Sequence, residues 1–161
     1  MGSYIGSSPL LAFSIASLLV VGNASQVRAQ DGCSDESLRG RYAIQGSGTV
    51  MSGPFAGPAA FVGILRFDGA GHLDGSFTQR LNTATGPVTL RVPIGGSYTV
   101  NADCTGEDMV VNQLTGAFNT QELILIDHAT EFVFVVTTVG TPPIVSGTAR
   151  KLSSGENDGN Q

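Results

Sequence analysis

The sequence has few positive charges. Of its 161 residues, 8 are Lys or Arg against 13 Asp or Glu, the formal net charge is −5, and Lys151 is the single lysine. Proteins that bind nucleic acid displace the counterions of the phosphate backbone with clustered Lys and Arg. The chain has no such cluster, so nucleic acid is excluded as a partner.

Tryptophan is absent, and the only tyrosines are Tyr4, Tyr42 and Tyr98. β-Barrels that span an outer membrane carry girdles of aromatic residues at both interfaces, and their strands have about 10 residues. The β-prone segments of this chain are shorter on average. We therefore expect no membrane span in the mature chain.

Signatures of common enzyme sites are also missing. No G-x-S-x-G sequence is present, and His72 and His128 are the only histidines, which leaves little basis for a nucleophile and its base. Neither cysteine, Cys33 or Cys104, has a histidine near it in sequence. Catalytic residues therefore stay unassigned, and no cofactor is expected.

The first 29 residues have the pattern of a secretory signal peptide. Leu10 to Val21, "LLAFSIASLLVV", is too short to span a bilayer comfortably, and Val27-Arg28-Ala29 is an A-x-A-like cleavage site. The segment before the apolar run has no Lys or Arg, so a retained anchor is the alternative. Cleavage after residue 29 leaves 7 basic and 13 acidic residues, a formal charge of −6. We expect a secreted or periplasmic protein.

The mature chain contains two cysteines, Cys33 and Cys104. Thiol pairs in exported proteins meet an oxidising compartment and tend to be joined. We predict a single disulfide between the start of the mature chain and a turn in its middle.

From residue 40 onward, short β-prone runs alternate with clusters of Gly, Pro, Asn and Asp, and no helical period is evident. This pattern predicts an all-β domain over 30–151, with a disordered tail over 152–161. Eight or nine strands with short connections favour a single antiparallel up-and-down β-barrel, with a sandwich as the alternative. The expected strands are 40–51, 60–68, 72–82, 87–92, 96–102, 108–113, 121–128, 131–138 and 144–151.

Two polar clusters could be turns or metal sites. In "FDGAGHLDG", Gly69 and Gly71 suit a tight hairpin turn, Asp68 can bond its own backbone, and the spacing of a calcium loop is absent. In "IDHATEF", Asp127, His128 and Glu131 surround a second presumed hairpin turn. Metal ligands usually come from several elements, so we interpret both clusters as turns and expect no metal site.

Several strands are apolar on both faces. Leu123 to Ile126 and Phe132 to Val136 are continuous apolar runs, and "AFVGILRF" has the same pattern. In a barrel the outer apolar face must be covered. We expect a homo-oligomer that forms through residues 121–138.

Two motifs carry a resemblance to known proteins. The pattern C-x4-L-x-G-x-Y-x-I extends from Cys33 to Ile44, and "GGSYTVNADCTG" lies in the middle of the chain. Together with "GILRFDGAGHLDG" and the closing "VSGTARKL", they resemble a group of small exported bacterial proteins of unknown function, over about residues 33–151. The resemblance implies a small calycin-type or allene-oxide-cyclase-like β-barrel.

The expected function is binding of an apolar small molecule inside the barrel. Small barrels either fill their interior or hold one ligand. One alternative is a cyclase or isomerase, which needs an ionisable group among the apolar ones; the strand-borne candidates are Arg66, Arg80, Arg91 and Glu122. A structural or surface-interaction protein is the other alternative. The candidate cavity residues are Tyr42, Ile44, Phe61, Leu65, Phe77, Tyr98, Phe132 and Phe134.

Overall fold

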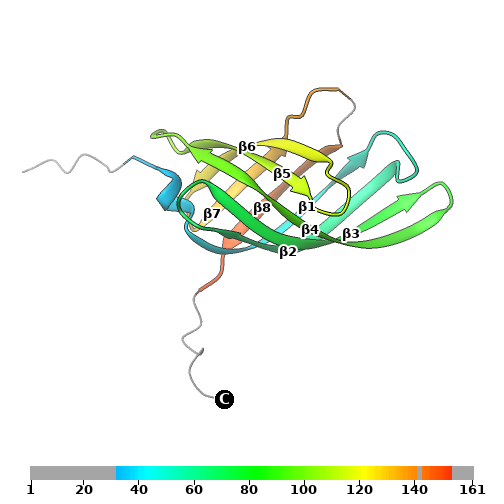
Figure 1. Ribbon diagram of the computed structural model, residues 1–161, viewed down its shortest axis with the longest axis horizontal. Helices are drawn as coiled ribbons and strands as arrows, with labels where there is room; N and C mark the ends of the chain where they lie inside the picture. The colour runs from blue at the N-terminus through cyan, green and yellow to red at the C-terminus, as the bar shows by residue number, and fades with distance from the viewer. Residues whose placement is uncertain (1–31, 141–142, 154–161) are drawn as a thin grey trace, which may run out of the picture.

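A computed structural model describes residues 32–140 and 143–153. A short 3-10 helix, η1 (Asp35–Leu38), precedes eight antiparallel strands that close into an up-and-down barrel in sequence order, because β1 pairs with both β2 and β8 (Figure 1). The strands are β1 (Gly40–Val50), β2 (Gly57–Phe67), β3 (His72–Thr83), β4 (Gly86–Val100), β5 (Thr105–Asn112), β6 (Phe118–Ile126), β7 (Glu131–Val136) and β8 (Ile144–Lys151).

The barrel confirms the predicted fold class. One difference is that the expected strands 87–92 and 96–102 form a single strand, β4. Pro93 and the pair Gly95-Gly96 predict a break, but β3 pairs with β4 without interruption from Ser97 to Gly86. The long partner strand thus holds both halves of β4 together. The predicted signal peptide over 1–29 and most of the predicted tail over 152–161 lie outside the described residues.

Side chains alternate strictly between the inside and the outside of the barrel. In β6, Leu123 and Leu125 are buried while Ile124 and Ile126 are exposed. In β2, Leu65 is buried while its neighbour Ile64 is exposed. The apolar runs of the sequence therefore divide into one set that builds the core and another that lies on the outer surface.

One end of the barrel is closed by packed side chains. Leu38 of η1 is fully buried there, together with Tyr42, Phe67, Tyr98 and Phe132. The ring of Phe67 meets those of Tyr42, Tyr98 and Phe132 edge-on, with centroids 5.0 to 5.7 Å apart. Edge-to-face packing of this kind stabilises an aromatic core beyond its burial.

Both inward tyrosines place their hydroxyl groups on backbone partners at the closed end. The Tyr42 hydroxyl donates to the carbonyl of Ala129 at 2.6 Å, and burial raises the pKa of Tyr42 to about 12. The Tyr98 hydroxyl donates to the carbonyl of Asp35 at 3.1 Å and accepts the N–H of Gly69 at 2.9 Å. These bonds tie η1 and two turns to the barrel wall.

The segment between β2 and β3 is a turn, as predicted. The Asp68 carboxylate accepts the N–H groups of Ala70 at 2.7 Å and His72 at 3.0 Å, and these bonds hold the pKa of Asp68 below its ordinary value. Gly69 and Gly71 have φ of 81° and 94°, in the region that favours glycine. The cluster around Asp127 and His128 is likewise the β6–β7 turn.

The predicted disulfide is present. Cys33 and Cys104 are joined, with Cα atoms 4.9 Å apart and 71 residues of separation in sequence. The bond fixes the segment before η1 to the β4–β5 turn. Closing a loop of this length disfavours the unfolded chain by about 4 kcal/mol on a loop-entropy basis. A disulfide is typical of proteins that fold in an oxidising compartment.

Within residues 32–140 and 143–153, no helix is long and apolar enough to cross a membrane.

Candidate ligand-binding site

The half of the barrel opposite η1 encloses a cavity of about 500 Å³. This volume lies within the range of small-molecule sites, about 300 to 1,000 Å³. Most of its wall is apolar, and every strand contributes to it. The apolar strand residues that line it are Ile44, Val50, Phe61, Leu65, Phe77, Leu81, Leu90, Val92, Ile94, Val110, Phe132, Phe134, Val136 and Val145.

Six of the eight residues proposed from the sequence line this cavity, namely Ile44, Phe61, Leu65, Phe77, Phe132 and Phe134. Tyr42 and Tyr98 point inward but lie in the packed closed end, where their hydroxyl groups are bonded to the backbone. The interior is therefore divided: the closed end is filled by side chains, and the other half is hollow.

Glycines in the wall make room for two of the cavity aromatics. Gly46 and Gly147 are cross-strand partners in β1 and β8. A methyl group at Gly46 would lie 2.5 Å from Cζ of Phe61, and one at Gly147 would lie 2.5 Å from Cζ of Phe134. Because these positions have no side chain, both rings lie close against the wall and leave the centre of this half open.

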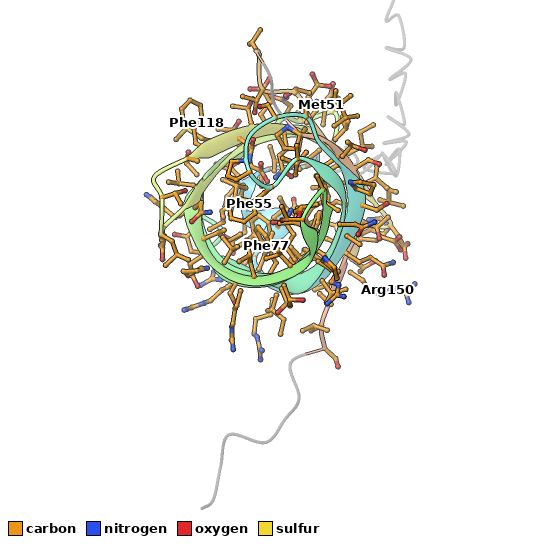
Figure 2. All side chains as sticks on the ribbon, turned by 90° about the vertical axis from the view of Figure 1, so that its right-hand side faces the viewer. Met51, Phe55, Phe77, Phe118 and Arg150 are labelled. Carbon is orange, nitrogen blue, oxygen red and sulfur yellow. A yellow bond between two sulfur atoms is a disulfide. The ribbon has the colours of Figure 1, made fainter. Side chains whose placement is uncertain are left out.

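The connecting segments at the open end of the barrel carry no charged residue. The four connections there are residues 51–56, 84–85, 113–117 and 137–143, and none contains Asp, Glu, Lys, Arg or His. By contrast, the turns of the closed end contain Asp68, Asp103, Asp127 and His128. Figure 2 looks toward the open end, with Phe77 inside the ring of strands, Phe55 across the opening and Met51 and Phe118 near its rim.

Large apolar side chains at this end are exposed. Leu114 in the β5–β6 connection is 69% exposed and Val139 in the β7–β8 connection is 97% exposed, and Met51 and Phe55 are exposed as well. Phe55 and Leu114 also line the cavity. A molecule that enters here therefore meets an apolar surface that continues into the cavity.

One acidic side chain, Asp108 of β5, lines the cavity. It is only 4% exposed, and its Oδ1 atom has no hydrogen-bond partner among the described residues. Burial away from water raises the pKa of Asp108 to about 8. The carboxyl group is therefore mostly neutral at pH 7.

Asp108 was absent from the candidates drawn from the sequence. The four strand-borne charges considered there, Arg66, Arg80, Arg91 and Glu122, are all exposed. In "TGEDMVVN" both alternating sets contain an apolar residue, so the pattern does not say whether Asp108 or Met109 points inward. The register settles this, because Asp108 pairs with the buried Tyr98.

No group of three or more His, Cys, Asp or Glu among the described residues could hold a metal ion. The polar residues of the cavity lining are Gln79, Arg91, Asp108, Asn112, Thr115, Asn119 and Gln121. Gln121 pairs with Asp108 across β5 and β6, and Asn119 pairs with Val110. Both amides line the cavity, so Asp108, Gln121 and Asn119 form one polar strip in an otherwise largely apolar wall.

The fold and the cavity define a closed eight-stranded up-and-down β-barrel with an apolar interior site. A solved structure of a redesigned β-barrel, mFAP1, bound to DFHBI, is similar to this chain, with a TM-score of 0.51 and 16% sequence identity over 73% of this chain and 97% of that one. At that identity the likeness shows the fold alone. No protein-family model and no curated protein matches the chain.

Proposed function

We propose that this protein is an exported carrier or sensor that binds an apolar small molecule in the open half of the barrel. The observation that carries the proposal is a cavity of about 500 Å³ whose wall is mainly aliphatic and aromatic. A void of this size leaves its lining without packing partners, which costs stability in an empty protein. An apolar ligand restores those contacts.

Two further observations support this function. The open end is uncharged and exposes apolar side chains that continue into the cavity, so an apolar molecule can reach the site without passing a charged surface. The similar barrel mFAP1 was solved with a small molecule, DFHBI, bound. Export is proposed from the N-terminal signal pattern, and the disulfide suits an oxidising compartment.

Binding is favoured over the cyclase or isomerase alternative by the composition of the cavity wall. A general acid–base reaction usually needs an acid and a base near the reacting atoms. Asp108 and Arg91 are the titratable residues of the lining, and the Arg91 side chain is exposed. Among the described residues, Asp108 is therefore the one titratable residue of the lining that is buried.

A tryptophan at Val110 should block the site. Val110 is buried and lines the cavity, so a larger ring there occupies the space that a ligand needs. We expect the wild-type protein to bind the neutral apolar probe N-phenyl-1-naphthylamine with a rise in its fluorescence. We expect Val110→Trp to weaken this binding roughly tenfold or more. The ring displaces part of the ligand, and loss of the burial of two or three methylene groups of the ligand has an effect of that size.

The matched control is Met109→Trp. Met109 is the next residue of β5, and its side chain is exposed on the outer surface. This variant should bind the probe as the wild type does. Binding that is absent from the wild type, or that Val110→Trp leaves unchanged, contradicts a ligand site in the cavity.

We also propose that the protein forms a homo-oligomer through the outer face of β6 and β7. Ile124 is 55% exposed, and Ile126 and Val135 are exposed beside it. A groove of about 400 Å³ runs over this face, lined by residues that include Ile124, Val133 and Val135. Ile124, Val133 and Val135 form an apolar patch that is bordered on the same face by Glu107 and Glu122. A two-fold contact can place such a patch against its own copy.

A further inference from the structure

A purely apolar ligand would leave the buried carboxyl group of Asp108 without a hydrogen-bond partner for its Oδ1 atom. Its carboxyl group is buried between Tyr98 of β4 and Gln121 of β6, its partners in register. The Tyr98 hydroxyl is already used at the closed end, where it bonds Gly69 and Asp35. Oδ1 of Asp108 has no partner within the described residues, and a buried carboxyl oxygen without a partner is costly.

The polar strip beside Asp108 offers further acceptors. Gln121 and Asn119 lie on the inner face of β6, in step with the buried Leu123, and both line the cavity. Asn112, the other asparagine of the lining, already accepts the N–H groups of Leu114 and Thr115 through Oδ1. One wall of the cavity therefore presents a carboxyl group with two amide side chains, and the facing walls are mainly apolar.

We propose that the cavity selects an apolar primary amine, whose ammonium group donates to Asp108 and to the amide oxygens of Gln121 and Asn119. The inference rests on the proposed binding function and names the class of its ligand. An ammonium group has three N–H donors and no acceptor, which matches a carboxylate and two amide oxygens. Hydrogen bonds between charged groups are stronger than those between neutral groups.

Other polar groups fit this strip less well. An ionised carboxylic acid has acceptors only, so it cannot donate to the amide oxygens of Gln121 and Asn119, and it pairs with Asp108 only while Asp108 keeps its proton. An alcohol supplies one donor where an ammonium group supplies three. The apolar wall takes the rest of the molecule in each case, so head-group chemistry decides among ligands of equal size.

Binding of the amine should release a proton. Burial raises the pKa of Asp108 to about 8, so the carboxyl group is protonated in the empty cavity. A bound ammonium group favours the ionised carboxylate instead. The group that faces Asp108 from β4 is Tyr98, the one from β6 is the non-titrating Gln121, and Arg91 of the lining has an exposed side chain. Amine affinity should thus rise roughly tenfold per pH unit between pH 5.5 and 7.5.

The test compares 2-naphthylmethylamine with 2-naphthylmethanol, which differ only in their polar group, by calorimetry on the full oxidised chain. At pH 7.5 we expect the amine to bind roughly 10- to 100-fold more tightly than the alcohol. In Asp108→Asn the preference should disappear while the affinity for the alcohol is retained. Glu107→Gln is the control, because it makes the same carboxyl-to-amide change at an exposed neighbour on β5.

The outcomes separate the two proposals. If the wild type binds N-phenyl-1-naphthylamine and the alcohol but shows no preference for the amine, the amine proposal is wrong and the apolar site stands. If neither the probe nor either naphthyl compound binds, the site itself is refuted. Proton release, measured in buffers of different ionisation enthalpy, tests the wild type without any variant: amine binding that releases no proton at pH 6.5 also overturns the proposal.

Discussion

Lysine at both Leu123 and Phe134 is expected to unfold the protein, whereas lysine at both Ile124 and Val133 is expected to leave the barrel folded and separate its subunits. The two pairs lie on the same strands and differ only in the face they occupy. Leu123 is 1% exposed and Phe134 is buried, while Ile124 is 55% exposed. In each pair the two residues are direct cross-strand partners of β6 and β7.

The difference in stability between the two double-lysine variants follows from the cost of burying charge. An unpaired ammonium group in the core costs several kcal/mol, and removing a large apolar side chain costs about 2 to 5 kcal/mol more. Two such changes match or exceed the whole stability of a small domain, about 5 to 15 kcal/mol. On the outer face the lysines remain in water and act only on an interface.

Circular dichroism and light scattering at micromolar concentration decide the matter. The inner pair should lose the β signal, and the outer pair should keep it at a lower molecular mass than the wild type. A wild type that is already monomeric under these conditions refutes the interface. An inner pair that folds normally would contradict the placement of the core.

Asp108→Asn is expected to stabilise the protein on the order of 4 kcal/mol at pH 7 and to have little effect near pH 4. The Asp108 carboxyl ionises near its ordinary pKa of 3.8 in the unfolded chain, but burial raises the pKa to about 8 in the folded one. A shift of one pKa unit corresponds to about 1.4 kcal/mol, and roughly three units separate 3.8 from pH 7.

The sign of the pH dependence is fixed by proton binding. Between pH 4 and 8 the folded state holds a proton on Asp108 that the unfolded state has released, so the stability of the wild type falls as pH rises through this range. Asparagine carries no such proton, and its shape is close to that of the neutral carboxyl group. The free energies of unfolding of the wild type and Asp108→Asn should therefore diverge as pH rises.

Urea unfolding at pH 4, 5.5 and 7 measures the divergence. Glu107→Gln is again the control. Because Glu107 is exposed, the difference in the free energy of unfolding between this variant and the wild type should not grow as pH rises. A constant difference between Asp108→Asn and the wild type at all three pH values would show that Asp108 is ionised in the folded protein.

The architecture could be predicted from the sequence because its signals are local. Gly69 and Gly71 mark one turn, Cys33 and Cys104 are the only pair that can form a disulfide, and alternation along β2, β6 and β7 separates two faces. The orientation of those faces could not be predicted in the same way. Ile124 and Leu123 are equally apolar, and only the closure of the barrel decides which of them points inward.

The cavity depends on long-range register, which a single sequence does not reveal. Tyr42 and Phe61 look alike as inward aromatics, yet the first fills the closed end and the second lines the hollow half. Their depth in the barrel is set by pairings such as Gly46 with Phe61 and Tyr42 with Leu65. Asp108 was missed for the same reason, because its burial results from pairing with Tyr98 on one side and Gln121 on the other.

Native mass spectrometry of the protein purified from the organism that makes it tests the central claim most directly. We expect the wild type and Met109→Trp to appear with an added small-molecule mass that is lost on activation, and we expect Val110→Trp to appear without it. The same adduct on all three proteins, or no adduct on any of them, would contradict an apolar ligand held in the open half of the barrel.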